Sequence, residues 1–405
     1  MNKLPSSGSG FRQRWGGPIL GAAFLMATSA IGPGFLTQTS LFTAQLTTSF
    51  GFVILISILL DIGAQLNIWR IVAVSELRAQ DLGNKLLPGT GYFLAALIAF
   101  GGLAFNTGNI AGCGLGVHVL TGLEPKTGAL ISCLTALAIF WYKEAGKVMD
   151  ILAKALGLLM IGLTLYIAFS SNPPVGEALY RTIWPEKTDA LLIITLVGGT
   201  VGGYISFAGA HRLLDAGIKG TQNLPQVTRS SVSGILITSV MRYTLFLAAL
   251  GVVTKGVTLA TGNPAETVFF SAAGELGRQF FGVVLWCAAI TSVIGASYTS
   301  VSFWKTLVPV VKKQEKVFIS LFIIASTLIF VTVGEPVTLL VLAGAVNGLI
   351  LPIALAIMLL AARKKDLAEN YRHPVLLQVA GWIVVAVMTY MGAVTLQSKL
   401  GSLFT

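Results

Sequence analysis

Long apolar stretches follow one another along almost the whole chain, and short polar segments separate them. A helix of roughly 20 apolar residues spans the hydrocarbon core of a bilayer, so each long stretch predicts one transmembrane helix. The pattern predicts an all-α polytopic membrane protein with about 11 helices, built as a single transmembrane domain over residues 1–405. The predicted helices cover residues 17–46, 50–75, 91–122, 128–143, 149–171, 190–214, 229–254, 279–304, 316–333, 336–362 and 374–397.

The composition agrees with a lipid environment. Hydrophobic residues make up 55% of the chain and charged residues only 11%, against roughly 25% charged in soluble domains. The net charge of +11 comes from basic residues in short loops, with no basic face interleaved with aromatics, so no nucleic-acid partner is expected. The three cysteines lie inside apolar stretches, without the spacing of a metal site or a disulfide framework. No cofactor is expected.

Basic residues are concentrated in alternate loops, which indicates the orientation in the membrane. These loops share a side with the basic N-terminus, which carries Lys3, Arg12 and Arg14. The opposite loops mix scattered lysine and arginine with glutamate. The positive-inside rule therefore predicts a multi-pass protein of the plasma membrane with a cytoplasmic N-terminus.

Two of the predicted helices contain residues that interrupt a helix. The first contains Gly32-Pro33-Gly34, where proline removes a backbone donor and glycine loosens the helix. The sixth contains four glycines between Gly198 and Gly203, which alone could also serve close helix packing. Interrupted helices at matching positions in two halves are typical of inverted-repeat transporters with a central site. The predicted repeats cover about 17–171 and 190–362, and the peripheral extra helix covers about 374–397.

Four segments carry a resemblance to a known family: Phe24–Gly34, Asn106–Gly122, Gly198–Tyr204 and Leu340–Pro352. They resemble the NRAMP family of proton-coupled divalent-metal transporters, and the similarity extends over most of the chain. The resemblance implies a LeuT-type 5+5 inverted repeat with helices 1 and 6 broken. It also implies secondary-active transport by alternating access.

The resemblance also implies that the family's metal ligands are missing from the first helix. The family has an Asp-Pro-Gly-Asn motif there, whose Asp and Asn bind the metal, whereas residues 32–35 read Gly-Pro-Gly-Phe. In the third helix, an Asp and a Glu that the family associates with proton movement are matched by Asn106 and Asn109.

The sixth and tenth helices depart from the family in the same way. The family's sixth helix offers a methionine sulfur followed by proline and histidine, and the matching residues here are Gly202, Gly203 and Tyr204. A glutamine near the site in the family's tenth helix is matched by Gly344.

These replacements change the expected substrate. A transition metal needs fixed electron-pair donors, and a dication is costly to bury without a carboxylate. The glycines predict a cavity wider than a bare ion needs. Helix N-termini, hydroxyls and amides donate hydrogen bonds and suit a small anion such as bicarbonate or a short carboxylate. The predicted substrate-binding residues are Gly32, Gly34, Phe35, Asn106, Asn109, Gly199, Thr200, Gly202, Gly203, Tyr204 and Gly344, and no metal ligand is predicted.

Five polar residues inside the helices are candidates for coupling or gating. Asp61, with Gln65 one turn later, suits proton or sodium coupling, and a structural pair with a basic residue such as Arg242 is the alternative. Arg242 itself could instead attract an anion. His211 suits a proton role or an ordinary hydrogen bond. Asn347 could reach the site or join two helices.

The sequence thus predicts a secondary transporter in the lipid bilayer that moves a small ionic substrate, with a proton or a sodium ion as the candidate symported ion. The alternatives are a proton-coupled transporter of manganese, iron or magnesium, an amino-acid transporter, and a non-transporting membrane sensor. An enzyme is not expected, because His118 and His373 lie without a paired nucleophile or carboxylate.

Overall fold

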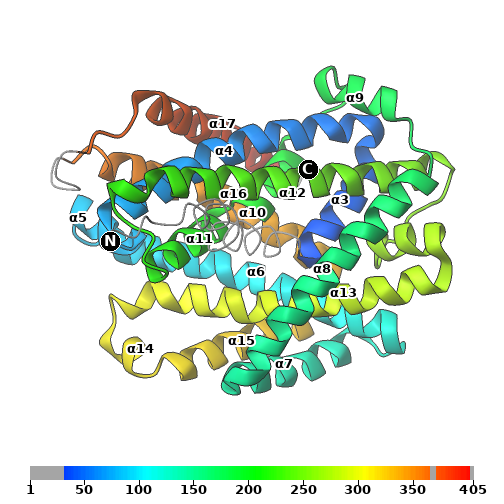
Figure 1. Cartoon of the computed structure of the whole chain (residues 1–405), viewed down its shortest axis with the longest axis horizontal. Coiled ribbons are helices and arrows are strands. Elements are labelled where there is room, and N and C mark those ends of the chain that lie inside the picture. The colour runs from blue at the N-terminus through cyan, green and yellow to red at the C-terminus, as the bar shows by residue number, and fades with distance from the viewer. Residues whose placement is uncertain (1–31, 365–370, 402–405) are drawn as a thin grey trace, which may run out of the picture.

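The computed structural model describes residues 32–364 and 371–401, and the side chains of these residues except 143–156 and 398–401. Every regular element in this part of the chain is a helix, and no strand occurs in it. Figure 1 shows most of the long helices running side by side between two ends where the loops lie. The all-α prediction is therefore confirmed here. Residues 17–31, the first half of the first predicted helix, lie outside the described residues.

Most helices follow the predicted apolar stretches to within several residues, but α13 begins at Pro264, well before the predicted start at 279, and contains a kink at Gly274. In chain order they are α3 (Pro33–Leu46), α4 (Phe50–Ser75), α5 (Ala79–Leu86), α6 (Thr90–Thr121), α7 (Pro125–Trp141), α8 (Lys143–Ser170), α9 (Val175–Ile183), α10 (Ala190–Thr200), α11 (Gly203–Asp215), α12 (Leu224–Thr254), α13 (Pro264–Lys305), α14 (Pro309–Lys313), α15 (Glu315–Val333), α16 (Pro336–Ala361) and α17 (Val375–Gly401). Two short 3₁₀ helices cover Thr47–Ser49 and Thr221–Asn223.

Most of these helices belong to segments that are long enough to cross a membrane. Within the described residues, eight segments are long and apolar enough to cross a bilayer, the first of which runs through α3 and α4. α7 is also apolar and has 17 residues. The chain bends by 105° between the last part of α8 and α9, so α9 lies across the direction of α8.

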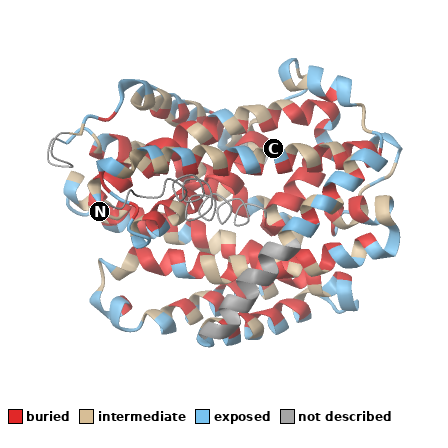
Figure 2. Ribbon diagram, in the orientation of Figure 1, coloured by how far each residue is buried: buried red, intermediate tan, exposed pale blue. Residues whose placement is uncertain are grey.

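The interrupted sixth span lies at the centre of the protein. In the apolar window of Ala190–Asp215, 89% of the residues are buried, against 28% in the windows of α15 and α17. α6 packs mainly against α13 and α16, and α16 packs in turn against α10. Buried residues concentrate on these inner helices in Figure 2. The protein therefore surrounds the interruption, and α15 and α17 are peripheral.

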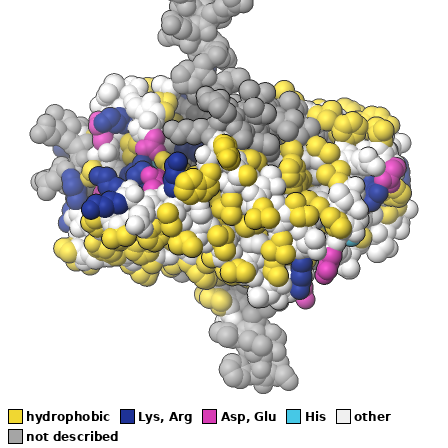
Figure 3. All heavy atoms as spheres, turned by 90° about the horizontal axis from the view of Figure 1, so that it is seen from below, with side chains coloured by type: hydrophobic (Ala, Val, Ile, Leu, Met, Phe, Trp, Pro, Cys, Tyr) yellow, Lys and Arg dark blue, Asp and Glu magenta, His cyan; other side chains and the backbone are white. Residues whose placement is uncertain are grey.

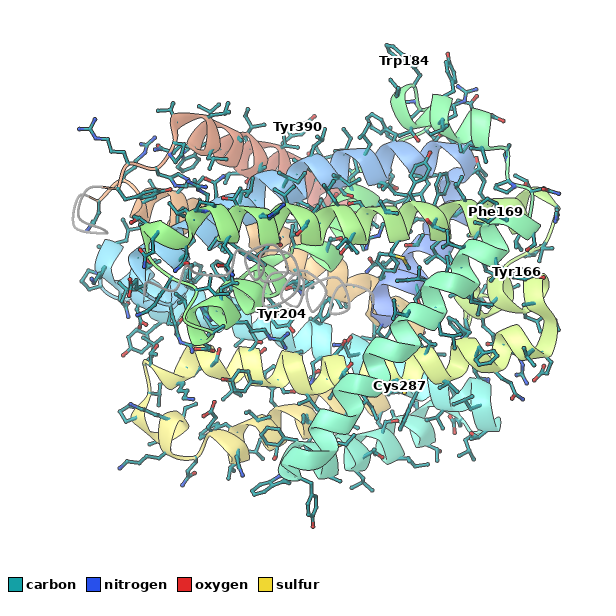
Figure 4. The ribbon with its side chains drawn as sticks, in the orientation of Figure 1. Tyr166, Phe169, Trp184, Tyr204, Cys287 and Tyr390 are labelled. Carbon is teal, nitrogen blue, oxygen red and sulfur yellow. The ribbon has the colours of Figure 1, made fainter. Side chains whose placement is uncertain are left out.

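The outer surface suits a bilayer. On the face shown in Figure 3, apolar side chains cover the middle and charged side chains gather at the two ends. Tyr390 on α17 is 71% exposed and points away from the other helices (Figure 4). An exposed apolar belt of this extent marks a lipid-facing surface in a protein with many apolar spans.

Candidate substrate site

The sixth span is interrupted where the glycines predict. α10 ends at Thr200. Val201 and Gly202 leave the helical conformation, and α11 begins at Gly203. The backbone N–H of Tyr204 donates to Asn347 Oδ1 at 3.2 Å, and Ser206 Oγ donates to the Val201 carbonyl at 2.6 Å. Side chains thus satisfy backbone groups that the interruption releases, which an apolar environment requires. The predicted break in the sixth helix is confirmed.

The first predicted span is described only from Gly32 onward. α3 begins at Pro33, with Gly32 in extended conformation before it. Proline at the first position of a helix needs no hydrogen-bond partner for its nitrogen. Gly32 and Pro33 are buried, so this helix start lies inside the protein.

Gln38, a residue that the sequence analysis did not single out, fills the space beside the glycines. Its Nε2 donates to the Leu340 carbonyl at 3.0 Å. A β-carbon at Gly344 would lie 2.6 Å from this Nε2, and one at Gly199 would lie 2.8 Å from Gln38 Oε1. The expectation of a cavity widened by glycine is therefore wrong at Gly344, because the Gln38 side chain occupies the space beside it.

Other glycines serve helix packing. A β-carbon at Gly198 would overlap the carbonyl oxygen of Gly344, and one at Gly203 would overlap the Ile350 side chain. α10 thus approaches α16 at backbone distance, as small residues allow, whereas α11 packs on a side chain of α16. Gly198 therefore serves close helix packing, which was the alternative for these glycines. Gly202 lies in the interruption between α10 and α11.

Arg242 of α12 connects α3 with the end of α10. Its Nη1 donates to Thr200 Oγ1 at 2.6 Å, and its guanidinium carbon lies 4.5 Å from the centre of the Phe35 ring. Thr200 is the last residue of α10, and its hydroxyl donates to the Leu196 carbonyl at 2.7 Å. Only 2% of Arg242 is exposed, so a positive charge is buried at the break.

Asp61 on α4 is the acidic group whose charge interacts with Arg242, yet the two do not form a direct ion pair. No nitrogen of Arg242 lies within 4.0 Å of an Asp61 oxygen, and Asp61 Oδ1 has no hydrogen-bond partner. Asp61 is 1% exposed. Gln65, one turn later, donates to the backbone and side-chain oxygens of Ser231 on α12, both at 3.2 Å.

Asn106 of α6 faces a different neighbour. Asn106 Nδ2 donates to Ser297 Oγ of α13 and to Ser326 Oγ of α15, both at 3.0 Å. Asn109 is also buried, and its Nδ2 has no partner. None of the hydrogen bonds of the described residues joins Asn106 to Thr200 or Arg242. Asn106 therefore joins α6 to α13 and α15 and makes no hydrogen bond to the groups at the break.

Tyr204 and His211 lie along α11. The Tyr204 ring packs 5.4 Å from the ring of Phe105, between α11 and α6 (Figure 4). His211 Nε2 accepts a hydrogen bond from the Ala79 backbone N–H at 3.2 Å, at the start of α5. His211 therefore has the ordinary hydrogen bond of the structural alternative, with its proton on Nδ1.

The donor set at the break differs from a metal site. In the part of the chain that the structure describes, no group of three or more His, Cys, Asp and Glu side chains is placed to hold a metal ion. The groups that converge there are a guanidinium, a hydroxyl and two carboxamides, from Arg242, Thr200, Gln38 and Asn347.

Comparison with known proteins adds the family. Residues 23–398 match the family model described as natural resistance-associated macrophage protein-like. The chain is 59% identical over 387 residues to the uncharacterized membrane protein YcsG of Bacillus subtilis. These residues cover 96% of each chain. An uncharacterized membrane protein of Haemophilus influenzae is 58% identical over 96% of this chain and 98% of its own.

Solved structures show the same fold at low sequence identity. A mutant of the Eremococcus coleocola manganese transporter has a TM-score of 0.69 at 14% identity, over 99% of this chain and 90% of its own. MhsT in complex with L-phenylalanine has a TM-score of 0.60 at 17% identity, over 95% of this chain and 99% of its own. The predicted LeuT-type fold is confirmed.

Proposed function

This chain belongs to the natural resistance-associated macrophage protein-like (Nramp) family, and on that premise we propose that it is a secondary transporter of a small anion. The substrate is held at the break between α10 and α11 and moves by alternating access. One observation carries the proposal: the charged group at the break is the guanidinium of Arg242, which is buried against Thr200 and Phe35.

The sign of this charge favours an anion over a metal cation. Two unit charges 4 Å apart interact by about 4 kcal/mol at an effective dielectric constant of 20, and a dication doubles the repulsion. The positions that match the family's ligands offer glycine, phenylalanine and tyrosine in place of carboxylate and sulfur. A manganese ion at Thr200 would therefore meet repulsion from Arg242, and the matched positions supply no carboxylate or sulfur to compensate it.

An amino acid is the second candidate, and Asp61 favours it. A zwitterion carries a carboxylate for Arg242 and an ammonium group for a carboxylate such as Asp61, which has an unpartnered oxygen. The same two residues would then recognise both ends of one substrate.

Orientation and organisation are part of the proposal. The helices of 17–171 and 190–362 form two inverted repeats within one domain, and the N-terminus is cytoplasmic in the plasma membrane. Support comes from the end of the molecule that holds α5 and α14 (Figure 1), because these short helices carry Lys85, Lys312 and Lys313 in segments predicted to be cytoplasmic.

Uptake into proteoliposomes tests the function. Purified protein is reconstituted, and labelled bicarbonate, acetate, lactate, alanine and Mn²⁺ are offered with and without a pH or sodium gradient. We expect saturable uptake of an anion or of alanine, and neither uptake of nor competition by micromolar Mn²⁺. Mn²⁺ uptake that is lost on Thr200→Ala would refute the proposal, and the absence of any flux would favour the non-transporting sensor.

A further inference from the structure

The guanidinium of Arg242 has one edge without any partner. Nη1 is occupied by Thr200, whereas Nε and Nη2 make no hydrogen bond although the residue is 2% exposed. These two nitrogens lie on the same side of the planar group and present parallel N–H bonds. A buried charged donor without a partner is costly, so this edge is suited to a ligand that supplies two acceptors.

The orientation of this edge is fixed by α3 and the end of α10. The Phe35 ring, in the first turn of α3, covers one face of the guanidinium at 4.5 Å. Thr200 holds Nη1, and Thr200 is itself tied to the Leu196 carbonyl one turn back. A group held at its face and at one nitrogen needs little further ordering when a ligand binds.

A second unpartnered group lies one helical turn from Phe35. Gln38 is three residues later on α3, so both side chains lie on the same side of this helix. Gln38 Nε2 is occupied by the Leu340 carbonyl, and Oε1 is buried without a partner. Oε1 points toward Gly199, the neighbour of Thr200 in α10. An acceptor without a donor thus lies beside the same end of α10 as a pair of donors without an acceptor.

We infer that the substrate is a small organic carboxylate that also carries a hydrogen-bond donor. Its two carboxylate oxygens bind Nε and Nη2 of Arg242, and a hydroxyl or N–H group a few bonds away donates to Gln38 Oε1. This inference rests on the proposed function and narrows its substrate class. A planar carboxylate accepts two parallel hydrogen bonds from the edge of a guanidinium group. A spherical anion such as chloride aligns less well with both N–H bonds at once.

Matched acids and variants test the inference. Purified protein in detergent is titrated with propionate and with lactate, which differ mainly by a hydroxyl, and uptake of both is measured in proteoliposomes. We expect wild-type protein to prefer lactate. Arg242→Lys keeps the charge but removes the edge, and it should weaken binding of both acids by about tenfold or more. Gln38→Leu should weaken lactate to the level of propionate and leave propionate unchanged.

Controls separate recognition from folding. Arg363→Lys, in an exposed loop, should bind both acids like wild type. Each variant is checked by size-exclusion chromatography and by its thermal midpoint, and Phe35→Leu provides a second way to disturb the guanidinium without removing it. We expect Phe35→Leu to weaken both acids equally.

The outcomes also distinguish this inference from the proposed function. Uptake of bicarbonate or chloride without any organic carboxylate would leave the proposed function standing and overturn the inference. If Arg242→Lys left carboxylate uptake unchanged, the inference would also be overturned and the proposed function would stand. Uptake of metal cations alone would overturn both.

Discussion

Replacing Asn347 with alanine removes three hydrogen bonds from one buried position. Its Oδ1 accepts from the Tyr204 N–H at 3.2 Å, and its Nδ2 donates to the carbonyls of Gly101 at 2.8 Å and Ala343 at 2.9 Å. The two carbonyls lie inside α6 and α16, where backbone N–H groups of the same helix also donate hydrogen bonds to them. The Tyr204 N–H lies in the first turn of α11 and has no such substitute.

The expected loss follows from this difference. One buried N–H left without a partner costs about 1–3 kcal/mol, and each of the two other bonds contributes about 0.5–1.5 kcal/mol. Asn347→Ala should therefore lower the free energy of unfolding by about 2–6 kcal/mol. At roughly 2 °C per kcal/mol, the thermal midpoint should fall by about 4–12 °C.

The assay compares two asparagines. Thermal unfolding in detergent is measured for Asn347→Ala and for Asn223→Ala, whose exposed side chain makes one bond to the Lys219 carbonyl. Asn223→Ala should change stability by no more than about 0.5 kcal/mol. Hydrogen–deuterium exchange should also accelerate in the first turn of α11 only in Asn347→Ala. Equal midpoints and equal exchange in the two variants would refute the assignment of these bonds.

Three further predictions concern packing, pH and charge. Gly198→Ala should lower the thermal midpoint because its methyl group would overlap backbone of α16, whereas Gly162→Ala, with open space around it, should leave the midpoint unchanged or raise it. Burial and the nearby positive charge of Arg70 lower the pKa of His373 to about 4. The unfolded chain then binds more protons between pH 6.5 and 4, so this contribution to stability is complete above about pH 6.5 and is lost at up to about 1.4 kcal/mol per pH unit toward pH 4. His373→Gln should flatten that part of the pH profile of the thermal midpoint, and an unchanged profile would contradict the shift. Asp61→Asn removes a carboxylate that competes for the guanidinium, so organic carboxylates should bind several-fold more tightly by calorimetry; weaker binding would contradict the competition.

The sequence predicted the helices and the break well because both depend on local properties. Twenty-residue apolar length identifies a spanning helix, and four glycines within residues 198–203 weaken the helix locally. Phe35, Thr200 and Arg242 were also singled out, and the structure brings these three together. What the pattern did not contain was their mutual contact, which depends on the rotation of three helices about their own axes.

Gln38 and Asn106 show where such reasoning fails. A polar residue one turn after Gly34 in an apolar helix was a usable signal for Gln38, but nothing local indicates that its side chain fills the space beside Gly199 and Gly344. Asn106 lies on the side of α6 that faces α13 and α15. In a helix buried on several sides, hydrophobic periodicity does not identify the face that points to the substrate.

The close approach of α10 to α16 has a mechanical consequence. Backbone of α10 packs directly on backbone of α16 at Gly198, where even a β-carbon would overlap the Gly344 carbonyl oxygen, and such close packing leaves little room for either helix to shift along the other. These two helices should therefore move as one rigid unit during a transport cycle. The change of direction then falls on Val201 and Gly202, so that α11 swings against a fixed partner, and each swing must break and remake the bond between Tyr204 and Asn347.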